Sequence, residues 1–91
     1  MTTKAYASVF DAIANTPQEA ANLRLRAELM HRIEKHVERK KWTQGEAAKH
    51  GGVTQPRMND LLRGRLSRFS LDALVNIAAD MGLRVELRAA A

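Results

Sequence analysis

The sequence predicts an all-α protein, a bundle of about five helices with one short β-strand near its C-terminus. Apolar residues recur at spacings of three and four along most of the chain, as on one face of a helix. Residues that start and stop helices separate these runs, and after the last of them apolar and charged residues alternate at 83–88. With 91 residues, the chain is expected to form a single domain over 1–91, whose thin core would gain from oligomerisation.

The composition favours a polyanionic partner. Lys and Arg number 15 against 10 Asp and Glu, which gives a net charge of +5 and an isoelectric point of about 10.2. The absence of cysteine excludes disulfides and thiolate metal sites. No apolar run approaches the roughly 20 residues of a membrane span, and no signal-peptide pattern occurs, so a cytoplasmic location without membrane contact is expected. Charge alone leaves open the alternative of a merely soluble basic domain.

Residues 1–15 are expected to form an N-terminal extension that contains one short helix. The side chains of Tyr6, Val9, Phe10 and Ile13 are apolar and have helical spacing. This helix either packs on its own domain or attaches to a partner.

A long helix is expected over residues 16–42. Thr16 can cap its start, a proline occupies the first helical position, and Glu19 occupies the third. Leu25 and Leu29 add a second apolar face, so the N-terminal half of the helix can pack on a second chain. The main apolar stripe consists of Leu23, Ala27, Met30, Ile33 and Val37.

Residues 43–64 have the pattern of two short helices joined by a tight turn. Thr43 and Glu46 can form a capping box at the start of the first helix. The glycines at 51–52 are expected to end that helix, and Thr54 starts the second one. This arrangement predicts a helix–turn–helix that binds DNA. The inner face of the second helix is apolar, with Met58, Leu61 and Leu62.

The polar face at the start of the second helix is suited to reading base edges in the major groove. Gln55 and Asn59 can each make a bidentate pair with adenine, and Arg57 with guanine. Asp60 either accepts a hydrogen bond from cytosine or holds Arg57 or Arg63 in place.

Contacts to the DNA backbone are expected around these base-reading residues. Gln44 and Thr54 stand at the starts of the two helices, where backbone amides favour a phosphate. Arg63, Arg65 and Arg68 lie in the loop after the second helix, which runs beside the DNA backbone in this motif. The alternative for these arginines is an ordinary solvated basic loop.

The chain is expected to close with a helix over residues 70–82, capped by Ser70, and a strand over 83–88. Nothing else in the sequence offers this strand a partner, so it should pair with another chain. That chain is either a second copy or the edge of a different protein's sheet. The apolar side chains of the strand are Leu83, Val85 and Leu87.

The sequence predicts no enzyme, no metal site and no cofactor. His31 and His36 are five residues apart, which places them about 140° apart around a helix and prevents them from binding one metal ion together. Glu34 and Glu38 lie on a charge-rich helix face and are better explained as solvated carboxylates. No phosphate loop, nucleophile elbow or metal-ligand spacing occurs.

The segments TQGEAAKHGGVTQPRMNDLLRG and RLSRFSLDAL resemble the λ-repressor-like, XRE-type helix–turn–helix proteins. More narrowly, the chain is similar from about Val9 through Arg88 to the small HigA-like antitoxins of type II toxin–antitoxin systems. That resemblance implies a homodimer that binds a palindromic operator, represses its own operon and neutralises a RelE-like or HigB-like toxin that cleaves mRNA. A stand-alone repressor without a toxin and a protein-interaction module are the alternatives.

The resemblance also implies roles for individual residues. Gln55, Arg57 and Asn59 match base-reading positions of the family, and Gln44, Thr54, Arg65 and Arg68 match backbone contacts. The sequence departs from the family at Gly51, where a larger apolar residue is usual, and this difference predicts a looser turn.

Overall fold

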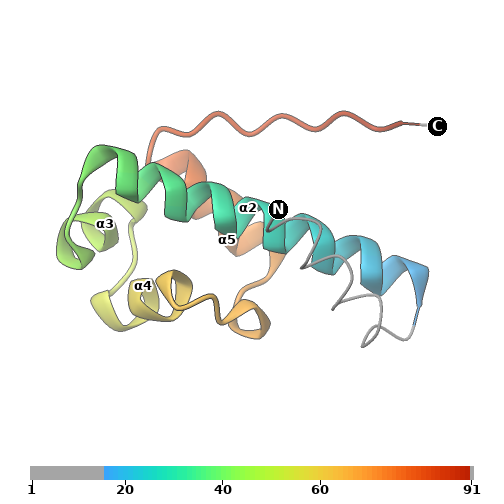
Figure 1. Ribbon diagram of the computed structural model, residues 1–91, viewed down its shortest axis with the longest axis horizontal. Helices are drawn as coiled ribbons and strands as arrows, with labels where there is room; N and C mark the ends of the chain where they lie inside the picture. Colours follow the sequence, from blue (N-terminus) through green and yellow to red (C-terminus); the bar gives the residue numbers. More distant parts are fainter. Residues whose placement is uncertain (1–15, 91) are drawn as a thin grey trace.

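The computed structural model describes residues 16–90 and contains there four α-helices and one 3-10 turn (Figure 1). The all-α class is confirmed for this part of the chain, whereas the expected N-terminal extension with its short helix lies outside the described residues. The elements are α2 (Pro17–Lys40), α3 (Gln44–Gly51), α4 (Gln55–Leu62), the 3-10 turn η1 (Leu66–Arg68) and α5 (Leu71–Asp80).

Each of the four helices begins at a hydroxyl cap that the sequence predicts. The side chains of Thr16, Thr43, Thr54 and Ser70 accept hydrogen bonds from the amide three residues further on. At Thr43 the capping box is complete, because its own amide donates to Glu46 over 2.8 Å. That hydrogen bond lowers the pKa of the Glu46 carboxyl. Each cap contributes about 1 kcal/mol, which matters for helices as short as α3 and α4.

The long helix α2 ends two residues earlier than the sequence predicts. Lys41 adopts a left-handed conformation with φ of 57°, and its amide donates to the Glu38 carbonyl over 3.0 Å. The Trp42 amide donates to the Val37 carbonyl over 3.2 Å, which completes a Schellman-type cap. Because a lysine occupies the position where glycine is usual, the sequence carries no stop signal there.

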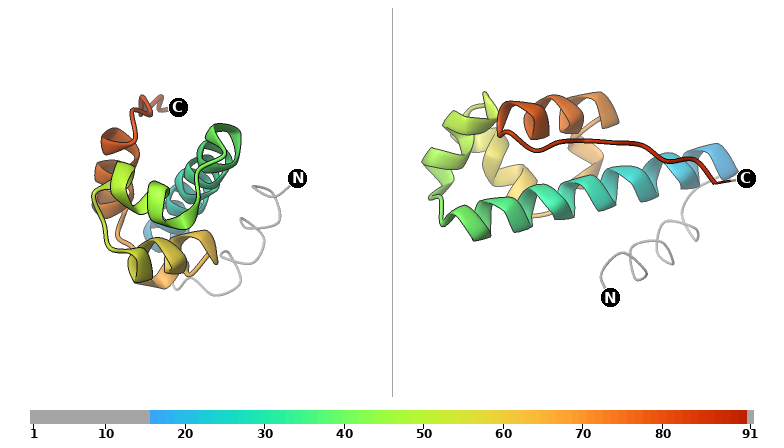
Figure 2. Two further views of the ribbon diagram at one scale, coloured as in Figure 1. Left: turned by 90° about the vertical axis from the view of Figure 1, so that its left-hand side faces the viewer. Right: turned by 90° about the horizontal axis from the view of Figure 1, so that it is seen from above.

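The expected strand at 83–88 is not formed within the described chain. Residues 83–90 run as an extended segment beside α2 and have no assigned secondary structure (Figures 1 and 2). The Leu83 amide donates to the Ala78 carbonyl over 2.9 Å, and no further backbone hydrogen bond attaches the segment to residues 16–90. A strand requires a ladder partner, and the described part of the chain offers none. Pairing with another chain stays a prediction.

The core lies where α2, α3, α4 and α5 meet. Helix α4 faces it with Met58 and Leu61, both fully buried, and thereby turns its opposite side outward. Leu62 packs at the edge of this core and is only partly buried. The largest fully buried side chains are those of Ile33, Met58, Leu61, Phe69 and Leu74.

The turn between α3 and α4 is closely packed around Gly51. Gly52 alone takes the left-handed conformation, with φ of 69°, whereas Gly51 is the last helical residue and is buried. A Cβ on Gly51 would stand 3.1 Å from Ile77 Cγ2 and 3.2 Å from Met81 Cε. A third atom, Met58 Cε, would stand 3.3 Å away. The prediction of a looser turn is therefore wrong, because neighbouring side chains fill the space that a larger residue would take.

We expect the substitution Gly51→Leu to lower the free energy of unfolding by about 1–3 kcal/mol, because it overpacks a filled site. Urea denaturation followed by circular dichroism measures this change. The double variant Gly51→Leu/Met81→Ala removes one occupant of the space and should recover part of the loss. A neutral or stabilising effect of Gly51→Leu alone would show that the turn is loosely packed after all.

Candidate nucleic-acid interface

Helices α3 and α4 form a compact pair whose relative position is set by the turn between them. The Val53 amide donates to the Ala48 carbonyl over 3.0 Å, and Val53 itself packs against the core. Ala47 and Ala48 are buried on the inner side of α3 and leave little bulk between the helices. Helix α4 lies on the opposite side of α2 and α5 from the extended segment 83–90 (Figures 1 and 2).

The starts of α3 and α4 are in direct contact. The Gln44 side-chain amide donates to the Gln55 carbonyl over 3.3 Å, so these two predicted DNA contacts lie side by side. A Cβ on Gly45 would stand 3.0 Å from Gln55 Nε2. The missing side chain of Gly45 therefore makes room for Gln55, a role that sequence reasoning did not assign to this glycine. Gln44, Thr54 and Gln55 are all exposed.

The structure gives Arg57, a predicted base reader, contacts within the protein. Its Nη1 donates to the Arg68 carbonyl over 3.1 Å, and its guanidinium lies 4.3 Å from the centre of the Phe69 ring. Arg57 is half-buried in this position. In this conformation it attaches α4 to the loop that follows, and to reach a base it would have to leave both contacts.

Asp60 holds two arginines of that loop. Its carboxylate pairs with Arg65 Nη1 at 3.1 Å and with Arg68 Nη1 at 3.0 Å. The sequence suggested Arg57 or Arg63 as the arginine that Asp60 holds, and the structure corrects this expectation. The turn of the chain after α4 brings the later arginines back over Asp60, and spacing along a single helix cannot show that return.

Asn59 and Arg63, the other predicted DNA contacts on α4 and the loop after it, are not held by side-chain contacts of this kind. Asn59 is half-buried and Arg63 is exposed. Neither side chain makes a hydrogen bond or an ion pair to another of residues 16–90. The surface thus combines exposed amides on α3 and α4 with four arginines and one aspartate at 57–68.

Arg26 of α2 holds the loop that follows α4, a role that the sequence analysis did not assign to it. Its Nη1 donates to the Phe69 carbonyl over 3.0 Å and to the Leu66 carbonyl over 3.4 Å. Its Nε donates to Asn22 Oδ1 over 2.7 Å, which orients the guanidinium. A signal existed, because Arg26 stands at the spacing of the buried stripe, four residues before Met30.

The described residues show no catalytic or metal-binding constellation. None of them form a group of three or more His, Asp or Glu side chains able to hold a metal ion. His36 and His50 instead flank Trp42, with ring centroids 5.3 Å and 4.0 Å from the indole. A half-buried Glu34 has its pKa raised, mainly by burial and then by the charge of Glu38.

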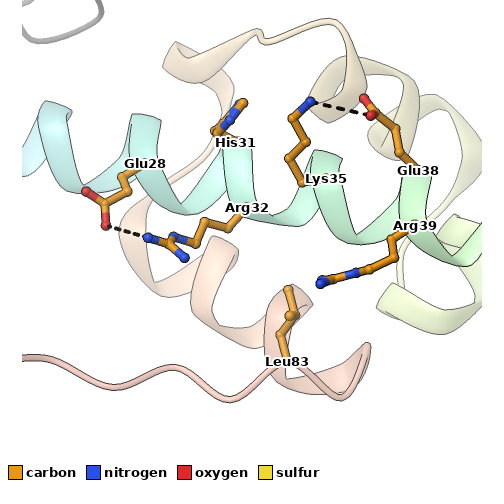
Figure 3. Close-up of a pocket in the computed structure, with 7 residues that line it drawn as sticks. All are labelled: Glu28, His31, Arg32, Lys35, Glu38, Arg39 and Leu83. Carbon is orange, nitrogen blue, oxygen red and sulfur yellow. Dashed lines mark ion pairs between the residues drawn. The ribbon is translucent and has the colours of Figure 1, made fainter. Parts of the chain in front are cut away.

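A hollow on α2 is lined by charges that pair along the helix itself (Figure 3). Arg32 stands 3.9 Å from Glu28, one helical turn away, and Lys35 stands 3.5 Å from Glu38. Leu83, the first residue of the extended segment, also lines the hollow (Figure 3). Such a face is explained by solvation and local pairing, and it offers no convergent acid and base.

The described helices, with a capped α3, a tight glycine turn and an α4 that buries its apolar side, define a helix–turn–helix protein. A comparison with protein-family models matches residues 12–90 to the family described as a helix-turn-helix domain, and the chain belongs to this family. That membership suggests DNA binding, in a family that is typically not enzymatic. No curated protein matches the chain. Within residues 16–90, no helix has both the length and the apolar character needed to cross a membrane.

The contacts of Arg57 predict a cost in stability. We expect Arg57→Ala to lower the free energy of unfolding by about 1–2 kcal/mol, because it removes a charge-assisted hydrogen bond and the stack on Phe69. Urea denaturation measures the loss. Arg63→Ala is the matched control, since it deletes an exposed arginine of the same surface and should change stability by less than about 0.5 kcal/mol. Equal stability of the two variants would show that Arg57 does not anchor the loop.

Proposed function

We propose that the protein is a sequence-specific DNA-binding transcriptional regulator that acts as a homodimer on a palindromic operator. The observation that supports this best is the orientation of α4. Its Met58 and Leu61 are buried, so Gln55 and Asn59 lie on the outward side, with the arginine-rich loop next to them. A helix presented in this way can enter the major groove while the adjacent loop meets the backbone.

Base reading is assigned in this proposal chiefly to Gln55 and Asn59. Both carry amides that can pair bidentately with adenine. Arg57 would read guanine only after leaving the Arg68 carbonyl and the Phe69 ring, so its part in recognition depends on that release. Asp60 would accept from cytosine at the expense of its arginine pairs, which makes it the weakest of the four proposed base contacts.

The DNA backbone is assigned to Gln44, Thr54, Arg63, Arg65 and Arg68. Arg65 and Arg68 keep substantial exposure while they pair with Asp60. Exposed ion pairs are worth little, so a phosphate can replace the carboxylate at small cost. The pairing holds both guanidinium groups in one place before DNA arrives.

The narrower proposal is an autorepressing antitoxin that neutralises an mRNA-cleaving toxin in the cytoplasm. It is supported by the resemblance of residues 9–88 to HigA-like antitoxins. A stand-alone repressor and a protein-interaction module are the competing proposals. Co-expression with the gene next to its own, followed by purification of the complex, separates them: a bound small basic RNase supports the antitoxin, and an unrelated neighbour that does not bind contradicts it.

Base contacts and backbone contacts can be separated by their dependence on sequence. The probes are a duplex selected from a random library by the wild-type protein and a scrambled duplex of equal length. We expect Gln55→Ala to weaken binding to the selected duplex by about 1–3 kcal/mol and to leave the scrambled duplex nearly unaffected. Arg65→Ala should weaken both alike and reduce the slope of log K against log salt by about 1.

Fluorescence anisotropy at two or more salt concentrations measures both effects. Binding that does not fall with salt would exclude phosphate neutralisation as the source of affinity. Equal losses for Gln55→Ala on the two duplexes would remove this residue from the base-reading set. Failure of the wild-type protein to select any duplex would refute the proposed function.

A further inference from the structure

We propose that residues 83–87 pair with the same segment of a second copy as antiparallel strands, with Val85 opposite Val85 on the dimer axis. This inference rests on the homodimer of the proposed function and assigns the surface and the register through which it forms.

The exposed apolar surface of the described chain is concentrated at this segment. The large apolar side chains that are exposed among residues 16–90 are Leu25, Val85 and Leu87, at 41%, 44% and 79%. All three line one groove of about 460 Å³ between α2, α5 and the segment. Its other apolar lining residues are Leu29, Leu71, Val75 and Leu83. A groove with seven apolar lining residues, bordered by Glu28, Arg32, Arg84 and Glu86, beside a backbone without ladder hydrogen bonds is typical of a protein interface.

The charges of the segment select the register. With Val85 opposite Val85, Arg84 of each strand lies opposite Glu86 of the other, and Leu83 lies opposite Leu87. Every charged pair is then of opposite sign and every apolar residue meets an apolar one. In the single chain, Arg84 and Glu86 pair with each other at 3.2 Å but remain 88% and 65% exposed, so that contact contributes little.

Other registers are less favourable. Centring the pair on Arg84 or Glu86 places like charges opposite each other, and a parallel in-register pair does the same. A slip by one residue sets charged side chains against apolar ones. Centring on Leu87 pairs Glu86 with Arg88 but leaves Leu83 without an apolar partner from the described segment. Centring on Val85 therefore places apolar residues opposite each other on one face of the ribbon and opposite charges on the other.

The same geometry fits a DNA-binding dimer. The twofold axis of an antiparallel pair is perpendicular to the two-stranded ribbon, so both copies direct the apolar face of the ribbon to the same side. Leu83 packs against the core, which shows that this face is turned toward α2 and α5. Helix α4 lies beyond them, on the far side from the segment (Figures 1 and 2). The two copies of α4 therefore lie on one face of the dimer, as two half-sites require.

Cysteine cross-linking tests the register in the full chain, which has no native cysteine. Directly opposite Cα atoms lie about 4.5–5.5 Å apart, within the range of a disulfide. On mild oxidation, Val85→Cys should give a covalent dimer on a non-reducing gel. Leu83→Cys and Leu87→Cys should cross-link when mixed and not separately. Efficient self-cross-linking of Leu87→Cys without Val85→Cys would overturn the register, and a monomeric wild-type protein would overturn the pairing.

Charge exchange gives a second test that does not depend on oxidation. Arg84→Glu should raise the dimer dissociation constant about tenfold, because the introduced carboxylate lies opposite Glu86 of the other strand at two places in the dimer. The variant Arg84→Glu/Glu86→Arg restores opposite signs and should restore the dimer in analytical ultracentrifugation. Arg88→Glu is the control and should have little effect. A loss for Arg88→Glu equal to that for Arg84→Glu, or no rescue by the exchange, would contradict the assignment.

The two proposals fail separately. Cross-linking through Val85→Cys in a protein that selects no DNA would leave the strand pairing in place and refute the regulator. Selection of DNA by a dimer that does not cross-link through Val85→Cys would refute the pairing and leave the regulator in place.

Discussion

An eight-residue helix does not persist in water by itself, so α3 and α4 depend on their caps and on what they bury. Thr43 and Thr54 each accept a hydrogen bond from one amide in the first turn of their helix, at about 1 kcal/mol each. Met58 and Leu61 supply the larger share for α4, because each is removed completely from water. The packing that stabilises α4 also determines which of its sides faces solvent. The burial of its apolar residues therefore serves both the stability of the helix and the proposed contact with DNA.

The arginines at the candidate interface fall into two groups. Some hold the loop in place through hydrogen bonds to its backbone, and others remain exposed at the surface. Arg26 and Arg57 donate to backbone carbonyls of the loop and hold it from two sides. The Leu66 carbonyl also accepts from the Phe69 amide, whereas the Arg68 and Phe69 carbonyls depend on these two arginines, which make the path of the loop specific. Asp60 then gathers Arg65 and Arg68 at the surface. A positively charged loop is thus held in a defined place although its own residues form only a 3-10 turn.

Local features of this fold could be predicted from the sequence, and contacts between distant residues could not. The caps at Thr16, Thr43, Thr54 and Ser70 are hydrogen bonds across three residues, so spacing alone identifies them. The contact of Arg26 with the loop joins residues 40 or more positions apart, and charge composition does not show it. The end of α2 was missed for a different reason, since a left-handed lysine has no sequence signal. Alternation at 83–88 indicated an extended chain correctly but could not supply the missing partner.

The extended segment and α4 lie on opposite sides of the bundle (Figures 1 and 2), yet the symmetry of the proposed dimer would connect them. A recognition helix of eight residues contacts few bases, so one copy gives limited discrimination, and a second copy multiplies it only if the two helices face the same way. An antiparallel ribbon meets that condition because its twofold axis points through the ribbon toward α4. A parallel ribbon would not. The alternating signs of Arg84 and Glu86 favour the antiparallel form, so a few charges far from the DNA would determine whether both recognition helices can reach it.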